Sequence, residues 1–573
     1  MNYVPHEPMR RILSFCVITA GVTLLLPGCQ SPFARSDYLN FSVPTDRLRT
    51  ITPQKLSELS MTEPVTIDEA MASEGYSLQE PAERIEFSIA DIRAAALESN
   101  LDLQVELISP SIAQTSVDEE EAKFDSTFNF SARRQKFDAP TALSTQASKA
   151  TIDSFSAGLD IPLRGGGTFN IDFPINETTT NNIFSTLNPS VTSDLRFSLS
   201  QPLLRNFGEY LNTHTIRVAK HQYQIASART KLEAIRILAN ADRAYWRLYA
   251  ARRELDVRVQ QYELAVTQLQ QAKRRVAAGD SPKIEITRAE SGLASRLEAI
   301  IITNTAVRRA ERNLKRIMNR EDLPLNSPTA IFLSTEPEPL GLDLDAERLV
   351  ANAIENRMEM LELELQLAID ASTIDLQRNQ ALPLVTLDYT YNINGLGGTH
   401  KSSFDLLDDR SFEDWTVGVN VQIPVGNQQA AARVHRAILQ RLQRLATREQ
   451  RAKAIEQEVY DAIDQLQQNW QRIIAASQEH QLALLTYEAE QRQFEVGVRT
   501  STDVLDSAAS LADAQSREIR ALTDYQISQV DIAFATGTLL GLDKVQWEPV
   551  DVPRETRTET MRRAIGLPGS RAN

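Results

Sequence analysis

The two halves of this 573-residue chain repeat each other, and the repeat constrains the fold more than any other feature. A shift of 218 residues places Gly279 on Gly497. The same shift keeps apolar residues on apolar residues in the flanking segments, pairing Leu248 with Leu466, Leu255 with Ile473, Val276 with Phe494, Ile286 with Val504 and Leu293 with Leu511. A period of this length is too long for a solenoid repeat. We therefore expect two copies of one large structural unit.

Each copy is expected to contain a helix, a group of strands, a very long helix, a tight turn and a last helix. The first helices are predicted at residues 88–123 and 345–380, and the long helices at residues 209–276 and 430–496. In the first long helix, apolar residues recur at alternating spacings of three and four, interrupted by one charge: Leu238, Ala241, Tyr245, Leu248, Arg252, Leu255, Val259, Tyr262, Val266 and Leu269. This heptad pattern predicts coiled-coil packing.

Between the first and the long helix of each copy, apolar and polar residues alternate over short segments. The first copy has four such segments, near residues 124–131, 155–161, 169–175 and 195–200, and the second has two, at 385–391 and 417–423. Alternation of this kind is typical of membrane β-barrel strands and also of half-buried soluble sheets. Each copy thus has an even number of predicted strands, so after its strands the chain would return to the side of the sheet from which it entered. Six strands are fewer than the eight of the smallest usual barrel, so several copies would share one barrel.

The N-terminus resembles an export signal. Residues 1–28 are predicted to be a signal peptide, with Arg10 and Arg11 before an apolar stretch at 12–26. The sequence Leu-Pro-Gly before Cys29 resembles a bacterial lipobox, so Cys29 is the expected lipidation site; an ordinary cleaved signal is the alternative. The other cysteine, Cys16, lies in the leader, which excludes an intramolecular disulfide in the exported chain.

The remaining flanks give the predicted domain limits. Residues 29–87 are expected to link the lipid anchor to the body, 88–320 and 321–542 to form the two structural repeats, and 543–573 to form a mobile tail.

Composition and motif spacing argue against several function classes. A net charge of −15 disfavours a nucleic-acid surface. The six histidines are scattered, and the nearest pair, His214 and His221, has no third metal ligand close by in the sequence. Gly165 to Gly167 lie between two predicted strands and indicate a hairpin turn, because no helix follows as a phosphate-binding loop requires. We expect neither an enzyme nor a cofactor or metal site.

Three stretches stand out in the sequence: FEVGVRTSTDVLD from Phe494, SQPLL from Ser200 and GTLLG from Gly537. They resemble motifs of the TolC-like outer-membrane factors, the outer membrane efflux protein family. The stretch from Phe494 to Asp506 is similar to the second periplasmic hairpin of that family. The resemblance covers residues 88–542. It implies a mainly α-helical homotrimer in which a helical α-barrel continues into an outer-membrane β-barrel shared between protomers.

The same resemblance implies a passive duct whose periplasmic tips dock an adaptor, the membrane fusion protein, bound to an inner-membrane pump. The tips are two short turns at 278–282 and 496–502, with adaptor contacts expected from Gly279, Asp280, Ser281, Pro282, Gly497, Val498, Arg499 and Thr500. Efflux of small molecules and secretion of polypeptides are both compatible with such a duct.

A periplasmic gate is also implied near these tips. Its basic partner would be Arg499, its acidic partner on the other hairpin Glu285, and its lumen acids Asp503 and Asp506. Arg288 occupies the position in the first copy that corresponds to Asp506, where it would neutralise part of an acidic ring. Phe494 stands where some members carry a hydrogen-bonding tyrosine. The alternative for these charges is a solvated helix end, and the alternative for the whole chain is a lipid-anchored coiled-coil scaffold without a pore.

Overall fold

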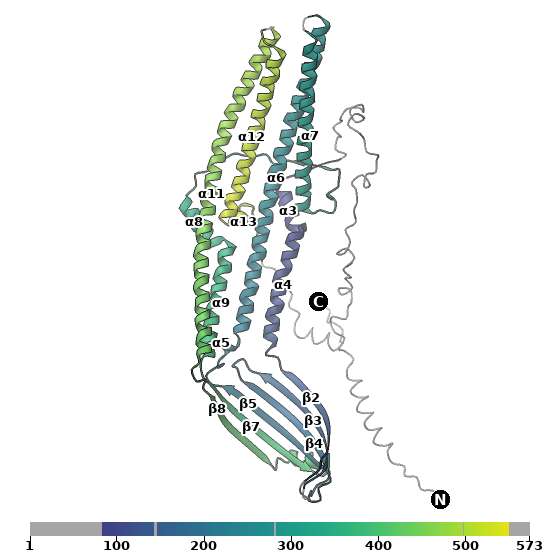
Figure 1. Cartoon of the computed structure of the whole chain (residues 1–573), viewed down its shortest axis with the longest axis vertical. Coiled ribbons are helices and arrows are strands. Elements are labelled where there is room, and N and C mark those ends of the chain that lie inside the picture. The colour runs from purple at the N-terminus through teal and green to yellow at the C-terminus, as the bar shows by residue number, and fades with distance from the viewer. Residues whose placement is uncertain (1–82, 142–145, 280–281, 497, 549–573) are drawn as a thin grey trace, which may run out of the picture. The chain divides into compact units, whose positions relative to one another are not determined.

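Two long helical hairpins dominate the computed structural model (Figure 1). The structure describes residues 83–141, 146–279, 282–496 and 498–548. The first hairpin joins α6 (His214–Ala277) to α7 (Ile284–Met318), and the second joins α11 (Gln428–Glu495) to α12 (Ser501–Ala535). With 64 and 68 residues, α6 and α11 are each about 100 Å long at 1.5 Å per residue. Both predicted long helices are confirmed.

The first helix of each half is broken in two, although the sequence predicted continuous helices. In the first half, Asn100 has an extended backbone (ψ 126°) and separates α3 (Ile89–Ser99) from α4 (Leu101–Ala122). Its side-chain oxygen accepts hydrogen bonds from the N–H groups of Asp102 and Leu103, at 3.0 and 3.1 Å, and so caps α4.

The second half breaks at the equivalent place. Arg357, with ψ at 131°, separates α8 (Ala346–Asn356) from α9 (Met358–Gln380). The side chain of Arg357 forms no capping hydrogen bond with α9, so its role at the break differs from that of Asn100. That role is described with the functional site.

A six-stranded antiparallel sheet lies at the end of the helices remote from the hairpin turns (Figure 1). Its strand order is β2 (Thr127–Asp138), β3 (Lys149–Pro162), β4 (Thr168–Thr180), β5 (Ser190–Pro202), β7 (Leu384–Gly397) and β8 (Glu413–Gln422). All six predicted strands are confirmed, and each half contributes an even number. The last strand of the first half, β5, pairs with β7 of the second, so the two inserts form one continuous sheet.

The two faces of the sheet differ in polarity, as the alternation predicted. One row across the apolar face consists of Phe128, Leu159, Ile171, Phe197, Tyr391 and Trp415. On the other face, Arg196 donates a hydrogen bond to Asn392 at 3.0 Å, and Asn392 donates one to Asp414 at 2.7 Å.

Three elements were not predicted. A small parallel pair joins β1 (Arg84–Phe87) to β6 (Ala330–Leu333). A short helix, α10 (His400–Asp408), lies between β7 and β8. It packs on the sheet, where the hydroxyls of Ser403 and Ser193 are 2.6 Å apart. Gly395 permits this approach, because a Cβ there would lie 2.4 Å from the Ser403 carbonyl oxygen.

The helical core follows the predicted heptad seam in the first part of α6. Leu238, Ala241, Tyr245 and Leu248 are fully buried. The charge in the seam, Arg252, forms an ion pair with Glu311 on α7. Beyond Arg252 the buried positions shift to others, including Val257, Ala265 and Ala272, because α6 packs against both α7 and α12.

The folded part of the chain extends beyond the predicted domain limits. Arg84 to Phe87 form β1, inside the segment predicted to be a linker. Asp543, the predicted start of a mobile tail, has a fully buried side chain, and Trp547 packs against the core. A short helix, α13 (Leu539–Leu542), follows α12. Asp543 comes directly after it and lies against Arg93 on α3. Residues 549–573 lie outside the described part.

Among the described residues, no helix is both long enough and apolar enough to cross a membrane.

Candidate functional site

The first hairpin turn leaves α6 at a glycine. Gly279 has φ at +82°, a left-handed conformation that glycine adopts without steric cost, and its N–H bonds to the carbonyl of Val276 at 3.1 Å. On the other side of the turn, the carbonyl of Pro282 accepts a hydrogen bond from the N–H of Glu285 at 3.1 Å. Asp280 and Ser281, predicted tip residues, lie outside the described residues.

The second hairpin turn restarts its helix with a capping box. The Thr500 hydroxyl accepts a hydrogen bond from the N–H of Asp503 at 3.3 Å, and the Asp503 carboxylate accepts bonds from the N–H and hydroxyl of Thr500, both at 2.9 Å. These hydrogen bonds lower the pKa of Asp503. Gly497, the counterpart of Gly279, lies outside the described residues. Asp503, predicted as a lumen acid, thus forms the capping box of α12 together with the N-cap residue Thr500.

The predicted partners of the gate do not pair directly in a single chain. Arg499 forms an ion pair with Glu490 at 3.1 Å and donates a hydrogen bond to Gln493 at 3.2 Å, both in its own hairpin. Glu285 pairs with Arg288 at 2.8 Å, one turn along α7. The expected ion pair between Arg499 and Glu285 is thus replaced by two local pairs, because each charge has a nearer partner on its own hairpin.

A cavity between the hairpin tips nevertheless brings these groups together. It has a volume of about 230 Å³, and its lining includes Pro282, Glu285, Arg499 and Thr500. The carboxylate of Asp506 does not take part in the capping box; the main-chain carbonyl of Asp506 accepts a hydrogen bond from Ser510. The structure therefore places three predicted tip residues, Pro282, Arg499 and Thr500, and the gate residue Glu285 around one space between the two hairpins.

The contact that joins the two tips was not predicted. The guanidinium of Arg275 on α6 lies 4.1 Å from the ring centre of Phe494 on α11, and Phe494 is 7% exposed. This geometry is that of a cation–π interaction. The duplication indicated an apolar contact here, because it pairs Phe494 with Val276 of the first copy, but no sequence pattern indicated the arginine.

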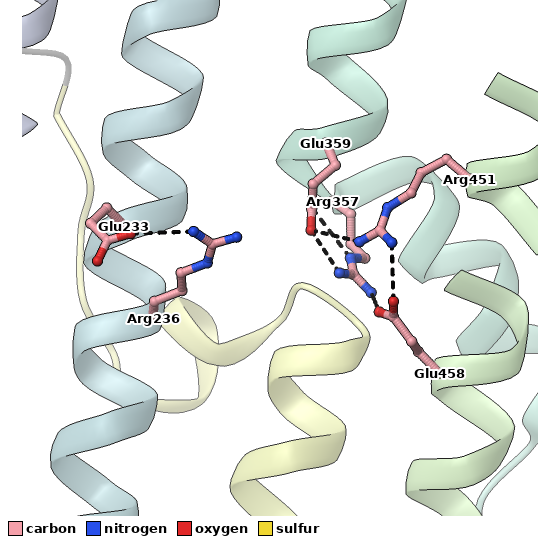
Figure 2. A network of polar contacts seen from close by, with 6 residues as sticks. All are labelled: Glu233, Arg236, Arg357, Glu359, Arg451 and Glu458. Atoms are coloured by element: carbon pink, nitrogen blue, oxygen red, sulfur yellow. Dashed lines mark hydrogen bonds and ion pairs between the residues drawn. The ribbon is translucent and has the colours of Figure 1, made fainter. Parts of the chain in front are cut away.

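A charge network around the buried Arg357 holds the break between α8 and α9 (Figure 2). The side chain of Arg357 is 5% exposed and pairs with Glu359, at 2.7 Å, and with Glu458 on α11. Arg451 pairs with the same two carboxylates, at 3.2 and 3.1 Å. Burial alone would lower the pKa of Arg357, but the hydrogen bonds with both glutamates outweigh it and raise the pKa above its ordinary value.

Two neighbouring groups complete this junction. Gly537, after α12, has φ at +71°, and a Cβ there would lie 3.4 Å from the Cγ of Arg357. On α6, Glu233 and Arg236 form a separate, more exposed pair at 3.4 Å, which Figure 2 shows apart from the Arg357 network. Arg357 thus lies where α8, α9, α11 and the end of α12 meet.

The first half has its own buried charge cluster. Arg93 on α3 donates hydrogen bonds to both oxygens of Asp242 on α6, at 2.8 and 2.9 Å, and lies 2.8 Å from Asp543. Both carboxylate side chains are fully buried. Burial and the negative charge of Asp242 raise the pKa of Asp543 to about 6, against the opposing effect of Arg93.

The histidine pair noted in the sequence has a structural explanation. The Nδ1 atom of His214 is 2.8 Å from the hydroxyl of Ser372 on α9, and burial lowers the pKa of His214. His221 interacts with Gln224 on the same helix, at 3.1 Å. Within the described residues, no three His, Cys, Asp or Glu side chains are placed to hold a metal ion.

Comparisons with known proteins agree with this architecture. Residues 349–538 match the family described as "Outer membrane efflux protein". The chain is 24% identical over 331 residues to outer membrane protein TolC of Vibrio cholerae, a match that covers 56% of this chain and 67% of TolC.

Two solved structures have a similar fold. The outer membrane channel CmeC of Campylobacter jejuni aligns with a TM-score of 0.60 at 15% identity, over 84% of this chain and 90% of CmeC. The outer membrane channel MtrE of Neisseria gonorrhoeae aligns with a TM-score of 0.55 at 16% identity, over 79% of this chain and 89% of MtrE.

Proposed function

Because the chain is a TolC-like member of the outer membrane efflux protein family, we propose that it forms the outer-membrane exit duct of a tripartite efflux pump or a type I secretion system. In this proposal three copies enclose one passive channel. Lipid on Cys29, outside the described residues, anchors each copy in the outer membrane. An adaptor joined to an inner-membrane pump docks on the helical tips and opens them.

The observation that carries the proposal is that both lateral sides of the chain expose apolar residues. The helices lie in the order α4, α6, α9 and α11, and the sheet ends in β2 below α4 and in β8 below α11 (Figure 1). One side exposes Leu101, Val105, Ile108 and Ile112 on α4 with Phe128 and Phe130 on β2. The other exposes Leu439 and Leu442 on α11 with Trp415, Val417, Val419 and Val421 on β8.

These two sides differ from each other, so copies would join head to tail and close into a ring. Closure would also remove the unpaired edges of β2 and β8. Three copies with six strands each would give an eighteen-stranded barrel, in the size range of porins that enclose an aqueous channel.

Mass and conductance measurements on purified protein test this function. We expect a trimer by native mass spectrometry in detergent and a channel with low basal conductance in planar lipid bilayers. A monomeric protein that never conducts would support the alternative, a lipid-anchored coiled-coil scaffold. That alternative leaves the exposed apolar faces of β2 and β8 without a partner.

The docking role of the tips has its own test. Arg499 is about half exposed at the second turn, so a photo-cross-linking residue at this position would be open to a docked partner. Placed at Arg499 in cells, the cross-linker should trap a periplasmic adaptor. The same cross-linker at Lys231, in the first third of α6 and far from the turns, is the matched control. Equal trapping at both positions, or none at Arg499 in folded protein, would reject the tip as the adaptor site.

A further inference from the structure

The two edge strands of the sheet are complementary in charge and shape, and we infer that β8 of one copy pairs with β2 of the next in one specific register. In this register Glu413 lies opposite Lys136. The inference rests on the proposed ring of copies and adds to it which residues meet at the seam.

Both edge strands lack a second neighbouring strand in the described part of the chain. Every residue of β2 is exposed, and so is every residue of β8 except Gly418. Among the described residues, neither Lys136 nor Glu413 has an oppositely charged group within ion-pair distance. The half of β2 remote from the helices carries Arg133, Arg134 and Lys136, whereas the corresponding end of β8 begins with Glu413 and Asp414. The two edges therefore carry opposite charges at the same end of the sheet.

The faces of the sheet restrict the possible registers. The apolar face contains even-numbered residues of β2, such as Phe128, and odd-numbered residues of β8, such as Trp415. β2 runs away from the helices and β8 runs back toward them, so a β8–β2 pair between copies is antiparallel. Keeping one apolar face therefore allows only registers that differ by steps of two residues.

Strand tilt narrows the choice further. Within one chain, the hydrogen-bonding row from Phe128 ends at Trp415. If Trp415 then pairs with Arg134 of the next copy, the row climbs six residues over six strands. With about 3.4 Å per residue and 4.8 Å between strands, this climb gives a tilt of about 35°. A climb of four residues gives a tilt of about 25°, and a climb of eight gives about 43°. Because barrel strands tilt by about 35–45°, the register with a climb of four is excluded, and those with climbs of six and eight remain.

Side chains distinguish the two registers that remain. In the six-residue register, Lys136 faces Glu413 and Arg134 faces the ring of Trp415. Below them, Ala132 faces Val417, and Phe130 and Phe128 face Val419 and Val421. All ten residues of β8 have a partner in β2. In the eight-residue register, Glu413 faces Asp138 and Val417 faces Arg134, which places like charges together and a cation on an apolar residue.

Disulfide trapping between copies tests the register. Ala132→Cys with Val417→Cys places two cysteines directly opposite each other in the six-residue register, and Arg134→Cys with Val417→Cys does so in the eight-residue register. We expect covalent trimers on non-reducing gels mainly from the first pair. Each substitution made alone reports any bond formed through Cys29.

Preferential cross-linking of the second pair, or of neither pair in a protein whose mass is trimeric, would overturn the register while leaving the duct intact. A protein that is monomeric by mass would instead overturn the ring itself.

Charge exchange provides a second measurement. Glu413→Lys or Lys136→Glu alone should lower the fraction of SDS-resistant trimer by about twofold or more, and the double variant should restore it. Asp408→Lys, an exposed change near the same end of the sheet, should leave that fraction unchanged. Failure of the double variant to recover would contradict the pairing of Glu413 with Lys136.

Discussion

At the scale of single residues, the tips are braced by contacts that the sequence only partly indicated. Arg499 is held by Glu490 and Gln493, and Phe494 by Arg275. Arg499 thus braces the second turn, and Arg275 connects the two hairpins. An adaptor that opens the duct would have to exchange these contacts for its own.

Removal of the Arg499 side chain should loosen the second turn. We expect Arg499→Ala to raise the basal conductance of the purified duct severalfold in lipid bilayers, because the turn loses its ion pair with Glu490. Arg492→Ala is the matched control, since Arg492 is 71% exposed and pairs at 3.7 Å with Glu488 one turn earlier. If both variants conduct like the wild type, Arg499 does not restrain the tip.

Asp543 should make stability depend on pH. Its pKa is about 6 in the folded chain and about 3.8 when unfolded, so the folded state holds the proton more tightly. The free energy of unfolding should therefore fall as pH rises from about 4 to 6, by at most about 3 kcal/mol, and stay level above. Asp543→Asn has an uncharged side chain at every pH. Its free energy of unfolding, measured by thermal unfolding at each pH, should therefore lack this fall between about pH 4 and 6. Identical pH profiles for the two proteins would contradict burial of the charged form.

At the scale of elements, the breaks at Asn100 and Arg357 show how two similar halves solve the same problem differently. Asn100 caps the following helix with its side chain and also donates a hydrogen bond to the carbonyl of Ile317 on α7, at 2.9 Å. Arg357 instead uses ion pairs to hold α9 against α11. On both sides of each break the helices pack on the same long helix, α6 in the first half and α11 in the second.

Loss of the Arg357 guanidinium should strongly destabilise the second half. Arg357→Ala would leave Glu359 and Glu458 close together without their most buried cation, at an expected cost of about 3–5 kcal/mol. Arg236→Ala, which removes an arginine that is 52% exposed and paired once, should cost less than about 1 kcal/mol. Unfolding in denaturant followed by circular dichroism compares them. Similar effects of the two changes would mean that Arg451 alone maintains the junction.

At the scale of the whole molecule, the apolar stripe on α4 is exposed, with no partner among the described residues, and is expected to face the next copy. Val105, at the centre of the stripe, is 69% exposed. Val105→Glu should shift purified protein from trimer to monomer, because a charge would be buried at the contact. Val105→Leu keeps the site apolar and should remain trimeric. Light scattering measures both masses, and a trimeric Val105→Glu protein would exclude α4 from the contact.

Much of the element order could be read from the sequence because helices and strands leave local periodicities. The heptad spacing around Leu248 and the alternation around Val419 identified the long helices and the six strands. α10 was missed because its nine residues are too few to show a helical period. β1 was missed because its four residues are stabilised by β6, which lies over 240 residues away.

The sequence by itself determined the duplication, the long helices, the strands and the positions of the two turns, since these depend on neighbours along the chain. Only the tertiary structure decided the partners of the charges: Glu285 with Arg288, Arg499 with Glu490, Arg357 with Glu458, and Arg93 with Asp242 and Asp543. An ion pair requires two groups within about 4 Å, and a sequence pattern does not specify that distance between helices far apart in the chain. For the same reason, the sequence showed only that Phe494 lacks the hydroxyl of a tyrosine. The structure showed that its ring is the partner of Arg275.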